Sequence, residues 1–163
     1  MAIHRLSNEQ WGFSSNCFVC EPKNAAGLRI PFEHDDEAQV VRATFTLDDR
    51  FSGAPAYVHG GVTLAVLDEA MAWATIAIGG KFAVTSETTT RFSYAVKVGR
   101  SYTVEATVAS SEGTTMATTA TVADERGRPC VTAAATFTVL GAAQAVDVLG
   151  VADLGADAGF VND

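Results

Sequence analysis

The sequence predicts an α+β fold in which one long central helix is wrapped by a curled antiparallel sheet of about five to six strands. Residues 59–78 are apolar on nearly all sides, which is typical of a helix at the centre of a fold. The segments that follow, to residue 140, are rich in Thr and Val and alternate between apolar and polar side chains. Such alternation indicates strands with one buried face, and that apolar face can cover the helix.

Composition favours a single soluble domain without a nucleic-acid partner. The chain has 163 residues, of which 48% are hydrophobic, and its net charge is -8 with only eleven scattered basic residues. Polar and acidic residues near the start interrupt any signal-peptide pattern, so we expect a cytoplasmic protein. Residues 62–78 are too short for a membrane span and carry Asp68 and Glu69 at their centre, so we expect no membrane association.

The first 58 residues predict a lead-in, two strands and a loop. Residues 1–27 are expected to be irregular or short-helical, residues 28–32 to form an edge strand broken by Pro31, and residues 34–37 to form a charged turn. Residues 38–47 alternate as a half-buried strand does, and residues 48–58 are rich in Gly, Pro and Ala, as loops are. The expected buried face of this strand consists of Val41, Ala43, Phe45 and Leu47.

The helix is expected to begin at His59 and to end at Gly79-Gly80. Four strands follow, with hairpin-type turns at residues 110–113 and 124–127, where glycine supplies a positive φ. The domain is expected to span residues 1–140. Residues 141–163 carry four Asp and no basic residue, and we expect an acidic C-terminal tail. A short amphipathic segment within it would use Val146, Leu149, Val151 and Leu154.

The three cysteines are expected to be reduced thiols, because their number is odd and no export signal is evident. Cys17 and Cys20 form one C-x-x-C pair without a second ligand pair, so a zinc ion would need distant residues or another subunit. We therefore expect a packed, thiol-lined loop, with no metal and no cofactor.

The acidic pair and the helix start are the candidates for chemistry. A carboxylate in an apolar helix is costly unless it has a partner or a function, and either acid could instead pair with Arg29 or Arg91. At the helix start, the N–H of Gly60 or Gly61 can stabilise an oxyanion. Asp68 follows Gly61 by seven residues and shares its helix face, whereas Glu69 points about 100° away.

The spacing along the helix predicts a dimer. Gly60 and Asp68 are eight residues apart, which is about 12 Å at 1.5 Å per residue. One substrate carbonyl cannot contact both ends of that span, so a site that uses both needs two chains. In a two-fold dimer with antiparallel central helices, two such sites form.

His59-Gly60-Gly61, Asp68 nine residues after the histidine and the strand order resemble the hotdog-fold acyl-CoA thioesterases of the phenylacetate-degradation type, which are related to one class of 4-hydroxybenzoyl-CoA thioesterases. Residues 16–20 with Asn24 and Gly27-Leu28 are similar to the lead-in of one branch of that family. The resemblance implies hydrolysis of an acyl-CoA or acyl-carrier thioester to a free acid and a thiol. It assigns Asp68 as nucleophile or general base, Gly60 as oxyanion donor, and Thr85 as a hydroxyl that positions water or substrate.

Several further residues are expected at this site. His59 is interpreted as a structural residue at the helix start and Glu69 as the second candidate acid. The expected substrate-binding residues are His59, Gly61, Glu69, Met71, Ala72 and Phe82.

Many relatives have Asn where this chain has Gly53, and Pro where it has Ala95. The expected partners are an acyl-CoA substrate and a second copy of the chain, with a tetramer as a further possibility.

Two alternatives stay open. One is a non-catalytic hotdog module that binds acyl ligands or assembles other proteins, which the Gly at position 53 favours. The other is a hotdog hydratase, which would pair Asp with a His close in sequence. The only other internal histidine, His34, lies in the expected charged turn.

Overall fold

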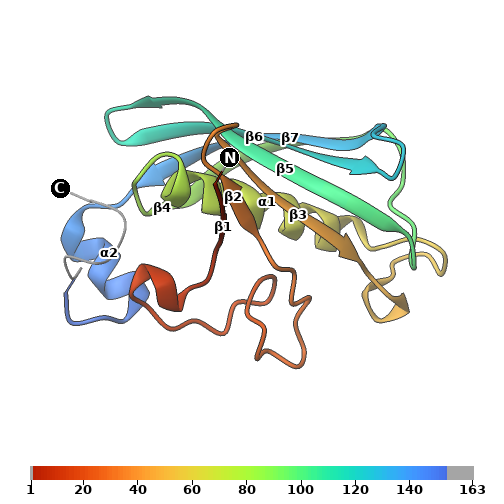
Figure 1. The fold of residues 1–163 in the computed structure, drawn as a ribbon, viewed down its shortest axis with the longest axis horizontal. Coiled ribbons are helices and arrows are strands. Elements are labelled where there is room, and N and C mark those ends of the chain that lie inside the picture. The colour runs from red at the N-terminus through yellow and green to blue at the C-terminus, as the bar shows by residue number, and fades with distance from the viewer. Residues whose placement is uncertain (1, 154–163) are drawn as a thin grey trace.

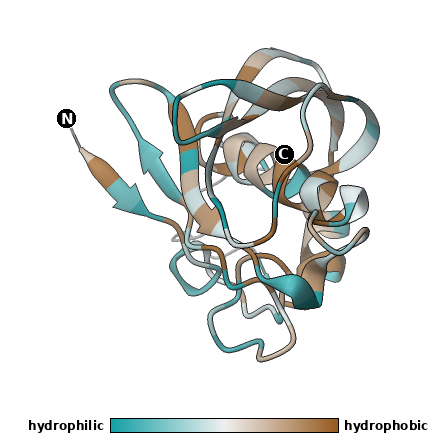
Figure 2. Ribbon diagram, turned by 90° about the vertical axis from the view of Figure 1, so that its right-hand side faces the viewer, coloured by the Kyte–Doolittle hydropathy of each residue, from teal (hydrophilic) through white to brown (hydrophobic). Residues whose placement is uncertain are grey.

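A computed structural model describes residues 2–153. Within them, an antiparallel seven-stranded sheet in the order β1-β2-β3-β5-β6-β7-β4 lies over the central helix α1, Gly60–Ala77 (Figure 1). Figure 2 shows the sheet curving around this helix. The strands are β1 Ile3–Arg5, β2 Glu33–Asp35, β3 Val40–Thr46, β4 Ala83–Phe92, β5 Ser101–Glu112, β6 Thr115–Asp124 and β7 Pro129–Val139. The α+β prediction is confirmed, and two short N-terminal strands raise the strand number above the expected five to six.

The N-terminal region differs from the prediction in the position of its edge strands. Residues 28–32 form no strand, because Pro31 has no N–H to donate and Arg29 has a φ of 54°. Residues 33–35, expected at the border of a charged turn, instead form β2, which pairs with β1 and β3. The charge is accommodated because Arg42 Nη2 lies 2.7 Å from the buried Asp35 carboxylate. The lead-in also contains a 3-10 turn, η1 Glu9–Trp11.

Helix α1 begins and ends where the sequence predicts. His59 caps its start, and Ile78 caps its end immediately before Gly79-Gly80. A Cβ on Gly79 would lie 2.6 Å from Met116 Sδ, so the close packing of this helix end on β6 requires glycine. The described residues include no helix that is long and apolar enough to cross a membrane. The helix side that faces the sheet is fully buried and includes Val66, Leu67, Ala70, Met71 and Ala74.

The predicted buried faces of the strands are confirmed. In β3, β5 and β7 the core side chains are Val41, Ala43, Phe45, Tyr102, Val104, Ala106, Val131, Ala133, Ala135 and Phe137. The loop before α1 contains a 3-10 turn, η2 Asp49–Phe51. One hairpin differs in detail, because β5 extends through Glu112 and the turn therefore falls at residues 113–114. Gly113 and Gly127 both have the expected positive φ.

Strand β4 lies at one edge of the sheet and is exposed along most of its length. It pairs with β7 on one side only within the described part of the chain. Val84, Phe92 and the nearby Tyr94 are large apolar side chains that remain 37%, 51% and 49% exposed. An open strand edge with exposed aromatic side chains is a surface on which another chain can pair.

The C-terminal segment includes a second helix, α2 Ala142–Leu149, which follows β7. Ala145 is fully buried, so α2 is docked on the domain. Figure 1 shows α2 and the lead-in on the side of α1 away from the sheet. Leu154 of the predicted amphipathic segment lies outside the described residues, as do residues 154–163 of the predicted acidic tail.

Candidate active site

The carboxylate of Asp68 lies at the centre of α1 and is paired with β4. Thr85 Oγ1 donates a hydrogen bond of 2.6 Å to Asp68 Oδ1. The β4–β7 register shifts between Thr85 and Glu87, and such irregularities re-aim side chains next to functional sites. Because the threonine hydroxyl donates to one oxygen, the second carboxylate oxygen is available to a substrate or a water molecule. Within residues 2–153, no lysine or arginine forms an ion pair with Asp68.

The two glycine N–H groups at the start of α1 differ in their partners. Gly61 N donates to His59 Nδ1 over 2.9 Å, so His59 satisfies this group. Val62 N and Thr63 N both donate to the His59 carbonyl. The N–H of Gly60 has no acceptor in the described part of the chain. Gly60 therefore presents the free donor at the positive end of the helix dipole.

Gly53 occupies a tight position beside this helix start. A Cβ at residue 53 would lie 3.3 Å from His59 Cα, closer than side chains ordinarily pack. Gly53 N also donates to the Tyr57 carbonyl over 3.0 Å. Gly53 thus packs directly on the backbone of the capping histidine.

Asp68 and Gly60 lie at different levels of one continuous helix. Their eight-residue separation is about 12 Å along the axis. A single chain therefore does not bring the candidate acid and the free N–H to one carbonyl. Thr85, in contrast, is brought directly to Asp68.

Glu69 lies on a different side of α1 and contacts the lead-in. Cys17 Sγ donates to Glu69 Oε1 over 3.3 Å. Burial, together with the neighbouring Cys17, raises the pKa of Glu69 to about 8. The hydrogen bond between the two thiols lowers the pKa of Cys17 to about 5 and raises that of Cys20, so Cys20 keeps its proton.

A cavity of about 280 Å³ opens beside Glu69, between α1, the lead-in and α2. Ala72 and Phe82, two of the residues predicted to bind substrate, are among its lining residues. Met71, which was also predicted to bind substrate, does not line this cavity, because its side chain is fully buried in the core under the sheet. The remaining apolar lining consists of Phe13, Trp73, Ile76, Val148 and Leu149.

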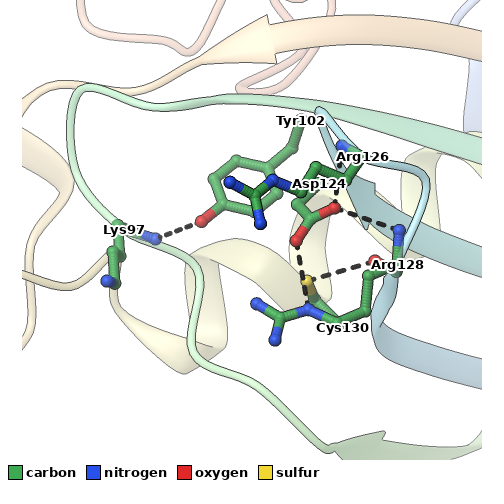
Figure 3. A network of polar contacts seen from close by, with 6 residues as sticks. All are labelled: Lys97, Tyr102, Asp124, Arg126, Arg128 and Cys130. Carbon is green, nitrogen blue, oxygen red and sulfur yellow. Dashed lines mark hydrogen bonds and ion pairs between the residues drawn. The ribbon is translucent and has the colours of Figure 1, made fainter.

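A basic cluster at a second cavity was not predicted from the sequence. This cavity of about 380 Å³ is bordered by Lys97, Arg100, Arg126 and Arg128. Asp124 orders the turn between β6 and β7, since it accepts hydrogen bonds from the backbone N–H groups of Arg126 and Arg128, each 3.0 Å long (Figure 3). Arg128 also pairs with Asp124 at 3.1 Å and lies 4.0 Å from the ring centroid of Tyr94.

Three of these cations, Lys97, Arg100 and Arg126, form no ion pair within residues 2–153. In a chain with a net charge of -8, four of the eleven basic residues thus border one cavity. The cluster adjoins the helix start, because Val58 N donates to the Val96 carbonyl over 2.9 Å. The sequence signal is weak, since these residues come from two loops that meet only in the fold.

The fold and this site define a hotdog architecture with an acid at the centre of its helix and a free N–H at the helix start. Residues 56–131, which include α1, Thr85 and all four residues of the basic cluster, match the family model of the thioesterase superfamily. Over this segment, which is just under half of its length, the chain is similar to the thioesterase superfamily.

Solved structures share this fold. RHA08564, a thioesterase superfamily protein, is 27% identical with a TM-score of 0.72, and the match covers 80% of this chain and 65% of that one. PaaI of the phenylacetic acid degradation operon of E. coli is 19% identical over 70% of this chain and 81% of that one, with a TM-score of 0.61. A hypothetical thioesterase of Streptococcus pneumoniae TIGR4, solved with coenzyme A, is 20% identical over 66% and 84%, with a TM-score of 0.58. None of the curated proteins matches the chain in sequence.

Proposed function

We propose that the protein hydrolyses an acyl-CoA thioester to the free acid and CoA at sites shared by two chains. The observation that carries this proposal is the 2.6 Å hydrogen bond between Thr85 and Asp68. It holds an otherwise unpaired carboxylate, which can act as nucleophile or as general base. The superfamily match and the neighbouring thioesterase structures support the same reaction class.

In the proposed reaction the free N–H of Gly60 donates to the thioester oxygen as negative charge develops on it. Asp68 attacks the carbonyl carbon, or deprotonates a water molecule that does so. The carbon–sulfur bond then breaks, and the thiolate of CoA leaves. Attack by Asp68 itself forms a mixed anhydride, which water hydrolyses to the acid while the carboxylate is regenerated.

A dimer supplies the second half of each proposed site. Because Gly60 and Asp68 are about 12 Å apart along α1, the donor for each carbonyl comes from the other chain. The open edge of β4, with exposed Val84, Phe92 and Tyr94, supports association on the side that carries Thr85. A Cβ on Gly60 would lie 3.8 Å from the Phe92 ring, so this surface also reaches the helix start.

The basic cluster supports a phosphate-bearing thiol such as CoA. CoA carries several phosphate groups, and unpaired lysine and arginine side chains are the groups that bind phosphate in proteins. One structural neighbour was solved with coenzyme A. We therefore place the nucleotide end of the substrate at the cavity bordered by Lys97, Arg100 and Arg126.

The first test is thiol release from a panel of acyl-CoA substrates by the wild type and Asp68→Asn. The substitution removes the charge and keeps the shape, so we expect kcat/KM to fall at least about 100-fold. Asp147→Asn, on the exposed part of α2, is the matched control and should retain full activity. Equal low rates in wild type and Asp68→Asn would instead favour an acyl-binding module.

The second test separates CoA from simpler thiols. Arg100→Ala or Lys97→Ala should raise KM for an acyl-CoA roughly tenfold, since each removes one charged contact to phosphate. The same variants should hydrolyse an acyl-N-acetylcysteamine thioester, which has no phosphate, at the wild-type rate. An equal loss on both substrates would rule out a phosphate-binding role. Arg50→Ala, at an exposed arginine elsewhere, is the control for loss of charge.

A further inference from the structure

We propose that Cys17, Cys20 and Glu69 form a zinc site that ties the lead-in to the central helix. One sulfur from each cysteine and one carboxylate oxygen all lie within 4.8 Å of one another, with 3.3 Å between Cys17 Sγ and Glu69 Oε1. In a tetrahedral site, Zn–S and Zn–O bonds place two sulfurs about 3.8 Å apart and a sulfur and an oxygen about 3.5 Å apart. The observed spacing therefore needs only small side-chain movements to accept the ion.

The loop that carries the two cysteines is held in place by its own backbone. Leu28 N donates to the Phe18 carbonyl, and Ile30 N to the Val19 carbonyl, each over 2.8 Å. A Cβ on Gly27 would lie 2.6 Å from the Phe18 oxygen, so this close approach requires glycine. The C-x-x-C pair is thus presented to α1 in a fixed conformation, with the spacing that zinc-binding loops use.

Donors surround the two sulfurs as they do around metal-bound thiolates. Val19 N lies 3.4 Å from Cys17 Sγ, and Asn8 Nδ2 lies 3.9 Å from Cys20 Sγ. Such contacts orient thiolate ligands and offset their negative charge. Asn8 is itself buried, which fixes the second of these donors.

In the described part of the chain, no protein cation occupies the ligand atoms of this cluster. No lysine, arginine or histidine in the described part of the chain forms an ion pair with Glu69. Zinc binding displaces the protons of its ligands, and two thiolates with one carboxylate then favour zinc over magnesium or calcium, because those hard cations require oxygen ligands. The sequence supplies only two ligands at short range, and the fold adds the third from α1.

Three protein ligands leave one position of a tetrahedral site open. Cys17 and Glu69 line the 280 Å³ cavity, whereas Cys20 borders a different cavity. The open position therefore faces the cavity beside Ala72 and Phe82, where water or a ligand atom completes the coordination. Asp68 is not among the ligands, so zinc binding does not require the acid of the proposed hydrolysis.

The test uses the full chain, kept reduced, stripped with a chelator and titrated with Zn²⁺ alone. We expect one zinc ion per chain and a rise in the melting temperature on binding. Bound Co²⁺ should give the sulfur-to-metal absorption bands of thiolate ligation. Cys17→Ser and Cys20→Ser should each lower zinc affinity at least about 100-fold, and Glu69→Gln about tenfold or more.

Cys130→Ser is the matched control, because this third cysteine is buried in β7 and contacts the Arg128 carbonyl instead. It should bind zinc as the wild type does, and so should Asp68→Asn. Circular dichroism checks the fold of each variant, and Glu69→Gln keeps both thiols if the serine variants fail to fold. The proposal is overturned if the folded wild type binds no stoichiometric zinc, if Cys17 and Cys20 persist as a disulfide under these conditions, or if all variants bind zinc equally.

Discussion

At the first turn of α1, two adjacent glycines have different roles. Gly61 N–H is satisfied by the His59 ring, whereas Gly60 N–H has no acceptor within residues 2–153. A substitution at residue 60 can remove the Gly60 N–H and leave the Gly61 N–H in place. Proline is well tolerated at the first position of a helix, and His59 already has the φ of -56° and ψ of 133° that a residue before proline adopts.

We expect Gly60→Pro to fold normally and to lower kcat about 100- to 1000-fold, which is the usual cost of losing one oxyanion donor. Gly60→Ala is the control, because it keeps the N–H and its Cβ would meet only ordinary contact with Phe92 at 3.8 Å. The measurements are steady-state kinetics and thermal melting of both variants. Full activity in Gly60→Pro would exclude this N–H from catalysis.

The position of a single residue was predictable from the sequence where it depends only on spacing within one helix or strand. The distance from His59 to Asp68 and the parity of the strand residues lie within short stretches of chain. The contact between Cys17 and Glu69 joins residues 52 positions apart, and the basic cluster joins two loops, so neither has a local pattern. The sequence also does not show that His59 satisfies Gly61 and leaves Gly60 free.

Among the elements, the end of α1 shows how closely helix and sheet approach each other. Gly79 lies against Met116 of β6 and against the Thr75 carbonyl. This contact shows how closely the C-terminal end of the helix approaches the sheet. The helix end itself was predictable from the paired glycines, but the contact was not.

Gly79→Ala should destabilise the protein by about 1–3 kcal/mol, since its Cβ would overlap Met116 Sδ and the neighbouring carbonyl. Urea unfolding measures the change. Gly141→Ala provides the control, because the Gly141 Cβ position has no neighbour closer than 3.9 Å. Met116→Ala combined with Gly79→Ala should recover part of the loss that the Met116 contact causes, and full additivity of the two substitutions would contradict this explanation.

The edge strands at the N-terminus could not be predicted from local sequence patterns. The polar triplet Glu33-His34-Asp35 has no strand-like alternation, yet it forms β2. Pairing with β3 and the ion pair from Arg42 to Asp35 stabilise it there. These stabilising groups come from another segment, so tertiary contacts outweigh the local turn signals.

For the whole molecule, the main prediction is that each active site contains Asp68 from one chain and Gly60 from the other. Mixing Asp68→Asn with Gly60→Pro tests this directly, because a mixed dimer contains one site with both Asp68 and an intact Gly60. Random exchange makes half of the dimers mixed, so activity should return to about a quarter of the wild-type value. Each inactive variant mixed with itself is the control. No recovery after verified subunit exchange would place both groups of a site within one chain.

Strand β4 carries Thr85 and is also the open edge of the sheet. In the proposed dimer, the surface that joins the chains and the hydroxyl that holds the carboxylate therefore belong to the same ten residues. Evolution cannot readily alter one property of this strand without the other. Substitutions that weaken association would also disturb turnover, so the enzyme would be active only at concentrations at which its subunits remain together.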